Sequence, residues 1–167
     1  MNNLKTIIGV IVIVLFFAGV IWVAKPSNPN TGTADINQAA AGEIAAEEPV
    51  FNFGEISMSK GKVSHQFKIK NDGVGPLKIE KIYTSCMCTT AKLISAGRSF
   101  GPYGMPGHGF IPKISATISQ NEEAIVEAVF DPAAHGPSGI GRIERAVYLE
   151  NSGGSPLELT FFATVTP

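Results

Sequence analysis

Two cysteines separated by a single residue, Cys86 and Cys88, are the side chains best suited to chemistry in this chain. They are its only two cysteines. Thiolate and thioether sulfur favour Cu(I), and thiolate also suits Zn(II). A disulfide across one residue closes a small ring in which the preferred bridge geometry is hard to reach, so such a bridge is expected to be reducible. Three interpretations stay open: metal binding, a redox-active or structural disulfide, and inert packing.

A glycine- and proline-rich segment, residues 95–113, supplies further soft ligands. Its sequence, SAGRSFGPYGMPGHGFIPK, predicts an irregular loop, and a loop of this length is usually functional or disordered. Met105 and His108 lie three residues apart across a Pro-Gly turn, which lets a thioether and an imidazole converge. We therefore expect a soft-metal site, for copper or zinc, whose candidate ligands are Cys86, Cys88 and His108, then Met105, with His135 and Met87 as weaker candidates.

Other chemistries have little support in the sequence. There is no GxSxG nucleophile elbow, no GxGxxG or GxxxxGK[ST] phosphate loop, and no second CxxC or HxxxH of a zinc finger. A Cys88–His108 nucleophile pair lacks a recognisable orienting Asn or Asp. Thirteen Lys and Arg against fourteen Asp and Glu give a net charge of -1, which is not a nucleic-acid-binding balance. We predict that the chain is not an enzyme and does not bind nucleic acid.

The N-terminal residues have the pattern of a membrane anchor. Residues 7–24 carry no charge and lie between Lys5 and Lys25, which predicts one transmembrane helix in contact with the lipid bilayer. A cleaved signal peptide is the competing interpretation, but its apolar region is normally shorter, and Trp22 stands where a small residue is expected. The positive charges predict a cytoplasmic N-terminus and an extracytoplasmic globular part, periplasmic or extracellular.

The rest of the chain divides at Pro49. Residues 26–49 are rich in Pro, Asn, Ala and acid and predict a flexible linker, within which residues 39–48 favour a short helix. We therefore expect an anchor at 1–25, a linker at 26–49 and one folded domain at 50–167.

Alternating apolar residues predict an all-β domain. Val63, Phe67 and Ile69 share one face of a strand, and similar alternation recurs in residues 124–130, 143–149 and 157–165. With strands near 51–56, 77–79, 89–94 and 114–118, this gives an immunoglobulin-like β-sandwich of about seven strands.

Four charged or titratable residues outside the candidate site have structural interpretations. His65 has the parity of Val63 and Phe67 and is expected to be a partly buried histidine. Arg145 has the apolar parity of its strand and is expected to line a sheet edge, and the acidic residues at 121–123 are expected to lie in a solvated turn.

Five sequence blocks carry a resemblance to a known family. They are FNFGEI at 51–56, VSHQFKIKNDGVGPLKI at 63–79, SCMCTTA at 85–91, VFDP at 129–132 and the closing LELTFFATVTP. Together they resemble the bacterial Ig-like family of unknown function 1573, a relative of the Hydin-type Ig-like domains. The resemblance implies an exported or membrane-anchored Ig-like domain without an established catalytic activity. Met87 replaces the glycine usual between the cysteines, and residues 95–113 resemble an insertion.

Two functions follow from these patterns. The first is a membrane-anchored extracytoplasmic binding module that presents its end loops to an envelope protein and binds a soft metal through the Cys86–Cys88 loop. The second is an extracytoplasmic thiol-disulfide redox or metal-handling protein that uses the same Cys86-Met87-Cys88 motif.

Overall fold

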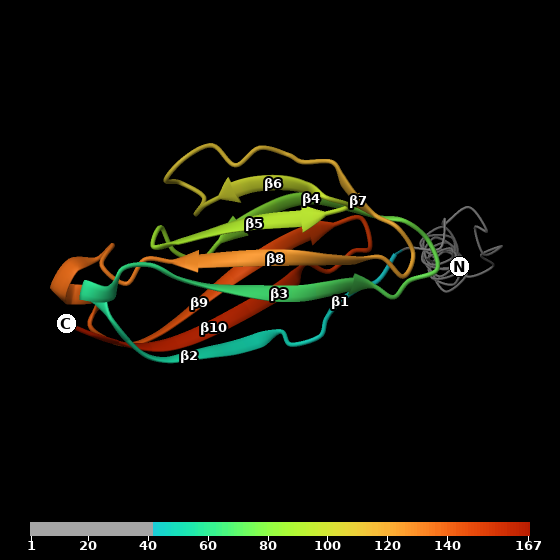
Figure 1. Ribbon diagram of the computed structural model, residues 1–167. Helices are drawn as coiled ribbons and strands as arrows, with labels where there is room; N and C mark the ends of the chain where they lie inside the picture. The colour runs from blue at the N-terminus through green and yellow to red at the C-terminus, as the bar shows by residue number, and fades with distance from the viewer. Residues whose placement is uncertain (1–41) are drawn as a thin grey trace, which may run out of the picture. The chain divides into compact units, whose positions relative to one another are not determined.

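The computed structural model describes residues 42–167, which form two five-stranded sheets packed face to face (Figure 1). One sheet has the order β1-β3-β8-β5-β6 and the other the order β2-β10-β9-β4-β7. The strands of the first sheet are β1 (Ile44–Ala46), β3 (Val63–Asn71), β5 (Thr89–Ser95), β6 (Arg98–Tyr103) and β8 (Glu123–Phe130). Those of the second are β2 (Val50–Ser57), β4 (Leu77–Thr84), β7 (Ala116–Ile118), β9 (Gly141–Asn151) and β10 (Leu157–Thr166).

This strand order is that of an immunoglobulin-like sandwich. Strands β1, β3, β8 and β5 correspond to the A-B-E-D sheet of such domains, and β4, β9 and β10 to the C-F-G sheet. All strand pairs are antiparallel except β2 with β10, which run parallel. The all-β prediction and the sandwich are therefore confirmed, with ten strands among residues 42–167 where about seven were expected.

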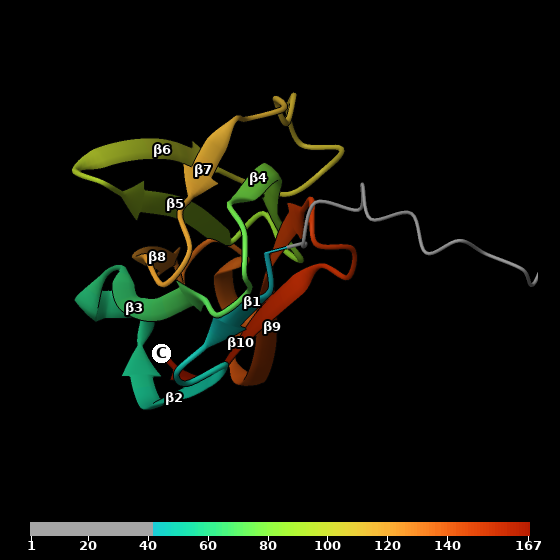
Figure 2. The same ribbon diagram turned by 90° about the vertical axis from the view of Figure 1, so that its right-hand side faces the viewer.

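The alternating apolar side chains that predicted the strands fill the space between the sheets. Residues of one parity from each central strand are almost completely buried, whereas their neighbours face solvent. Figure 2 shows the two layers from the end of the strands. The largest fully buried side chains are Phe67, Ile69, Leu77, Ile79, Ile82, Leu93, Ile118, Val126, Val147, Leu149, Leu159 and Phe161.

Two segments differ from the sequence-based expectation. Residues 44–46, inside the segment expected to be a linker with a short helix, form β1 and pair with β3. Residues 98–103, inside the segment expected to be an irregular loop, form β6 and extend the first sheet beyond β5. Ala96 and Gly97 join β5 to β6 with positive φ angles of 48° and 71°, as a tight hairpin requires.

The predicted anchor at residues 7–24 lies outside the described residues. Within residues 42–167, no helix has the length and apolar character needed to cross a bilayer. The helical segments in this range are two 3-10 turns, η1 (Met58–Lys60) and η2 (Gly136–Gly139).

Candidate functional site

The two cysteines lie on a short connection that crosses from one sheet to the other. The chain leaves β4 after Thr84 in the second sheet and enters β5 at Thr89 in the first. Thr84 is almost fully buried, and its hydroxyl donates to the carbonyl oxygens of Cys86 and Thr89, both at 3.0 Å. One buried hydroxyl thus holds both sides of the turn and fixes its shape.

Hydrogen bonds to neighbouring elements fix the position of this turn. The Ser85 N–H donates to the Ala146 carbonyl and the Ala146 N–H donates to the Ser85 hydroxyl, both at 2.9 Å. On the other side, the Cys88 carbonyl accepts from the Asp131 N–H at 2.8 Å. The cysteine turn is therefore attached to β9 and to the start of the β8–β9 connection.

Cys86 and Cys88 are joined by a disulfide, with their Cα atoms 5.2 Å apart. The two sulfur atoms are in unequal surroundings. Cys88 is 3% exposed and packs in the core, whereas Cys86 is half-buried at the surface. Cys86 is thus the more accessible of the two cysteines, and in thiol–disulfide exchange the accessible sulfur is the one that is attacked.

His135 lies against the sulfur of the half-buried Cys86. Its Nε2 atom is 3.1 Å from Cys86 Sγ. The residue comes from the β8–β9 connection, residues 131–140, which also crosses between the sheets and is drawn in orange at the left end of Figure 1. The His135 carbonyl accepts from the Ser138 hydroxyl at 2.6 Å, and Asp131 Oδ1 accepts from the Ala133 N–H at 3.0 Å, so the loop is internally braced.

Arg145 lies against the buried sulfur. Its Nε atom donates to Cys88 Sγ at 3.2 Å, and its Nη1 atom donates to the Glu144 carbonyl at 2.7 Å. The prediction that Arg145 lines a sheet edge is wrong, because β9 lies in the middle of its sheet between β10 and β4. Its inward parity was visible in the sequence, and a cation at an inward position signals a buried partner.

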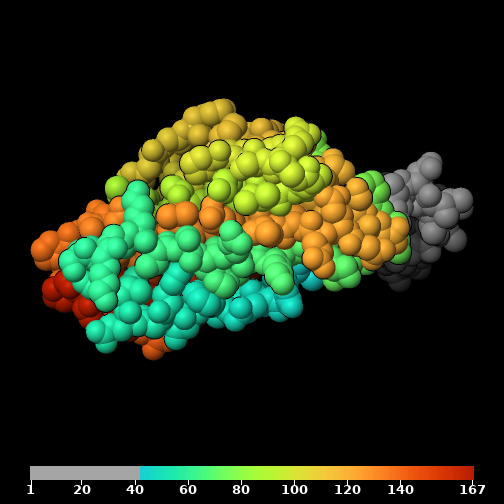
Figure 3. Space-filling view, viewed as in Figure 1, coloured from blue at the N-terminus to red at the C-terminus, as the bar shows by residue number. Residues whose placement is uncertain are grey.

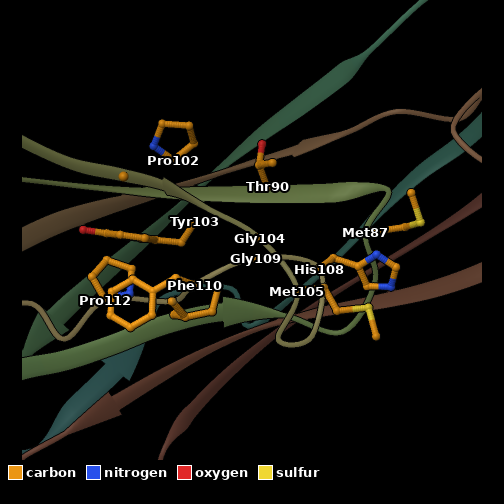
Figure 4. A pocket seen from close by; sticks show the side chains of 12 residues that line it. Met87, Thr90, Pro102, Tyr103, Gly104, Met105, His108, Gly109, Phe110 and Pro112 are labelled. Atoms are coloured by element: carbon orange, nitrogen blue, oxygen red, sulfur yellow. The ribbon is translucent and has the colours of Figure 1, made fainter.

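The structure brings together only part of the predicted ligand set. Among residues 42–167, the ligating atoms of Cys86, Cys88 and His135 lie within 4.8 Å of one another, and His108 is not in this group. Met105 and His108 instead line a pocket of about 570 Å³ together with Met87 (Figure 4). His135, placed last by sequence reasoning, is the imidazole nearest the cysteines, because residues far apart in sequence meet at the crossover end of a sandwich.

His65 is partly buried, as expected. Its ring stacks on Phe51 with centroids 3.5 Å apart and meets the edge of Phe67 at 4.6 Å. Burial lowers the pKa of His65 below its ordinary value, and the nearby Glu48 carboxylate opposes this shift. The residue belongs to an aromatic cluster of β2 and β3.

The fold and the cysteine centre together define an Ig-like β-sandwich with a disulfide-bonded cysteine pair on an inter-sheet loop. Residues 44–99 match the model of a protein family of unknown function, DUF1573. The match covers β1 to the start of β6, including the cysteine turn, and confirms the resemblance seen in the sequence over that segment. No curated protein sequence matches the chain.

Solved structures are similar to this chain at low sequence identity. A protein of unknown function from Porphyromonas gingivalis W83 is 13% identical, with a TM-score of 0.57 over 80% of this chain and 51% of its own. This chain thus spans about half the length of that protein. PapD-like domain 7 of human CEP192 is 12% identical, with a TM-score of 0.45 over 74% of this chain and 84% of its own. The YadV chaperone is 11% identical, with a TM-score of 0.48 over 74% of this chain and 52% of its own.

Proposed function

We propose that this chain is a membrane-anchored extracytoplasmic Ig-like domain whose Cys86–Cys88 disulfide exchanges with the dithiol of an envelope partner. The observation that carries the proposal is the asymmetry of the disulfide. The half-buried Cys86 sulfur has an imidazole beside it, and the buried Cys88 sulfur has a guanidinium beside it. The imidazole suits the stage in which a thiol attacks Cys86, and the guanidinium suits the stage in which Cys88 leaves as a thiolate.

The exchange can be written atom by atom. A partner thiol gives its proton to His135 Nε2, and the thiolate attacks Cys86 Sγ. The S–S bond breaks, and its electron pair goes to Cys88 Sγ, where the Arg145 guanidinium stabilises the negative charge. The partner's second thiol then gives its proton to the Cys88 thiolate and attacks the partner sulfur that is bound to Cys86 in the mixed disulfide. Cys86 leaves as a thiolate and takes the proton from His135. The partner dithiol loses two electrons and becomes a disulfide, while Cys86 and Cys88 are reduced.

Reduction kinetics of the full-length chain test this proposal. We expect His135→Gln to slow reduction of the disulfide by dithiothreitol at pH 7 by about tenfold, because the variant loses the base beside the attacked sulfur. His108→Gln is the matched control, since His108 lies outside the cysteine group, and it should react as the wild type does. Equal rates for His135→Gln and the wild type, or a disulfide that dithiothreitol cannot open in the folded chain, would contradict the proposal.

Soft-metal binding is the second candidate function, and the convergence of two sulfurs and one imidazole nitrogen within 4.8 Å favours it. Once the disulfide is reduced, Cys86, Cys88 and His135 offer three ligands suited to Cu(I) or Zn(II). We expect either metal to protect both thiols of the reduced full-length chain from alkylation, with His135→Gln weakening this protection. Undiminished alkylation at saturating Cu(I) and Zn(II) would remove this candidate.

The anchored topology has its own test. Residues 7–24, between Lys5 and Lys25, support a single span with the folded domain outside the cytoplasm. We expect the chain to stay with the membrane fraction after a carbonate wash, and its reduced cysteines to react with a maleimide that does not cross the cytoplasmic membrane. A chain released by carbonate, or labelled only after lysis of that membrane, would contradict the topology.

A further inference from the structure

A second group of soft donors lies beside the disulfide and uses no thiol. Met87, Met105 and His108 line one pocket, which extends between the cysteine turn and the segment that follows β6. In Figure 4 their side chains gather at one end of the pocket, and the two sulfur atoms lie on either side of the His108 ring in that view. Tyr103, Phe110 and Pro112 occupy the other end.

The lining of this pocket determines which ion it suits. None of its twelve lining residues is Asp, Glu, Lys, Arg or Cys. The soft donors on its wall are two neutral thioethers and one imidazole, and the other side-chain donors are the hydroxyls of Thr90 and Tyr103. Thioether sulfur selects Cu(I) and similar soft monovalent ions, whereas Zn(II) is bound by thiolate, imidazole and carboxylate ligands. The pocket has no anionic ligand to compensate a divalent charge.

The three donors lie on two segments that are hydrogen-bonded to the rest of the domain: the cysteine turn and the turn that follows β6. Met87 is the middle residue of the disulfide ring, and 49% of the residue is exposed. Met105 and His108 form the two ends of a turn in which the His108 N–H donates to the Met105 carbonyl at 3.3 Å. The base of that turn is attached to β4, because the Thr84 N–H donates to the Gly104 carbonyl at 3.1 Å.

The turn is placed at the surface by β6. The space-filling view shows the yellow segment, which contains β6 and the residues after it, as a ridge along one side of the molecule (Figure 3). Gly107, between the two donors, has a φ of +89°, a conformation that glycine adopts without strain. Gly107 thus allows the turn that places Met105 and His108 on the same pocket wall as Met87.

We propose that Met87, Met105 and His108 bind one soft monovalent ion, Cu(I), whether or not the Cys86–Cys88 disulfide is intact. This site is separate from the exchange centre proposed above and from the thiol site of Cys86, Cys88 and His135. Its donors carry no exchangeable proton at the thioethers, so binding depends less on pH than binding to thiolates does.

Silver(I) titration of the oxidised full-length chain tests the site without interference from thiols. Ag(I) is a soft monovalent probe that does not change oxidation state here, and the chain has no cysteine beyond the two in the bridge. The chain has four methionines, and their methyl carbons can be labelled with ¹³C. We expect the Met87 and Met105 methyl signals to shift together and saturate at one ion per chain, while the Met58 signal stays in place.

Matched substitutions decide the outcome. Met105→Leu and His108→Gln should each lower the Ag(I) affinity at least tenfold, and Met58→Leu should leave it unchanged. Saturation without a shift of Met87 and Met105, equal affinity in Met105→Leu, or displacement of Ag(I) by equimolar Zn(II) would overturn the site. These results are independent of the dithiothreitol kinetics, so failure of the metal site and failure of the exchange centre are distinguishable.

Discussion

Arg145 adds a charge difference to the unequal burial of the two sulfur atoms of the disulfide. Its guanidinium donates to Cys88 Sγ at 3.2 Å from a central strand, where little solvent surrounds that sulfur. A fixed positive charge stabilises a thiolate more than a thiol or a disulfide. In the proposed exchange, the assignment of Cys88 as the leaving sulfur therefore rests on the side chain that β9 presents inward.

Substituting Arg145 tests this assignment. Arg145→Gln keeps a hydrogen-bond donor but removes the charge, so we expect reduction by dithiothreitol at pH 7 to slow by about tenfold, equivalent to about 1.4 kcal/mol of lost stabilisation of the leaving thiolate. The control is Arg142→Gln on the same strand, where the arginine lies over the Phe162 ring, 5.8 Å from its centroid, at the surface. Unchanged kinetics in Arg145→Gln would remove Arg145 from the exchange step.

His65 gives the domain a pH dependence that is separate from the cysteine centre. Burial against Phe51 and Phe67 lowers the pKa of His65 in the folded chain. His65 therefore takes up a proton near pH 6.5 in the unfolded chain but only at lower pH in the folded chain. The free energy of unfolding consequently falls as the pH drops below 6.5. We expect His65→Phe, which keeps the stacked ring, to reduce this loss between pH 7 and pH 5.

Urea unfolding at a series of pH values measures the effect. Glu48→Gln is the informative companion, because the Glu48 carboxylate raises the pKa of His65 and its removal should deepen the loss of stability. If the free energy of unfolding of His65→Phe falls in parallel with that of the wild type from pH 7 to pH 5, the lowered pKa of His65 in the folded chain is contradicted.

At the scale of elements, the site depends on two connections that pass between the sheets at one end of the sandwich. The turn from β4 to β5 carries the disulfide, and the connection from β8 to β9 carries His135. The start of β5 pairs with the end of β8, Thr89 opposite Phe130, which brings the two connections together. His135 thus lies beside Cys86 Sγ because β5 and β8, which lead to the two connections, are hydrogen-bonded in register.

Thr84 is the hydroxyl on which the cysteine turn depends. Thr84→Val keeps the shape of the side chain but leaves the Cys86 and Thr89 carbonyls without its hydrogen bonds, and we expect a loss of about 1–3 kcal/mol in the free energy of unfolding. Thr90→Val, at an exposed position on β5 just after the cysteine turn, should change stability by less than about 0.5 kcal/mol. Equal stability of the two variants in urea would contradict the role assigned to Thr84.

Local patterns predicted the strands better than they predicted which loops meet. Alternation in residues 63–69 and 157–165 reflects burial on one face, a property that each strand carries by itself. The pairing of His135 with Cys86, across a sequence separation of 49, depends on sheet register, which no local pattern records. The strand at 98–103 was missed because its Gly101 and Pro102 indicate a loop, whereas pairing with β5 overrides that preference.

At the scale of the whole molecule, stability and chemistry reside in different places. The core is formed by side chains of the central strands, and Phe161 on β10 contacts Phe53 and Phe130 with ring centroids 5.4 and 5.5 Å apart. The disulfide, by contrast, encloses three residues at one end. In the chain-entropy description, closing so short a loop contributes only about 1.6 kcal/mol. We therefore expect the core to stay packed when the disulfide is reduced.

Comparing reduction with a core substitution tests this separation. We expect reduction of Cys86–Cys88 to lower the free energy of unfolding by no more than about 1.6 kcal/mol, whereas Phe161→Ala should cost about 3–5 kcal/mol. Phe162→Ala is the matched neighbour, because Phe162 points away from the core, and it should cost far less. Unfolding in urea, with near-ultraviolet circular dichroism to follow the aromatic packing, measures all three. A reduced chain that loses as much stability as Phe161→Ala would mean that the disulfide supports the fold, and an exchange centre could not cycle without unfolding its own domain.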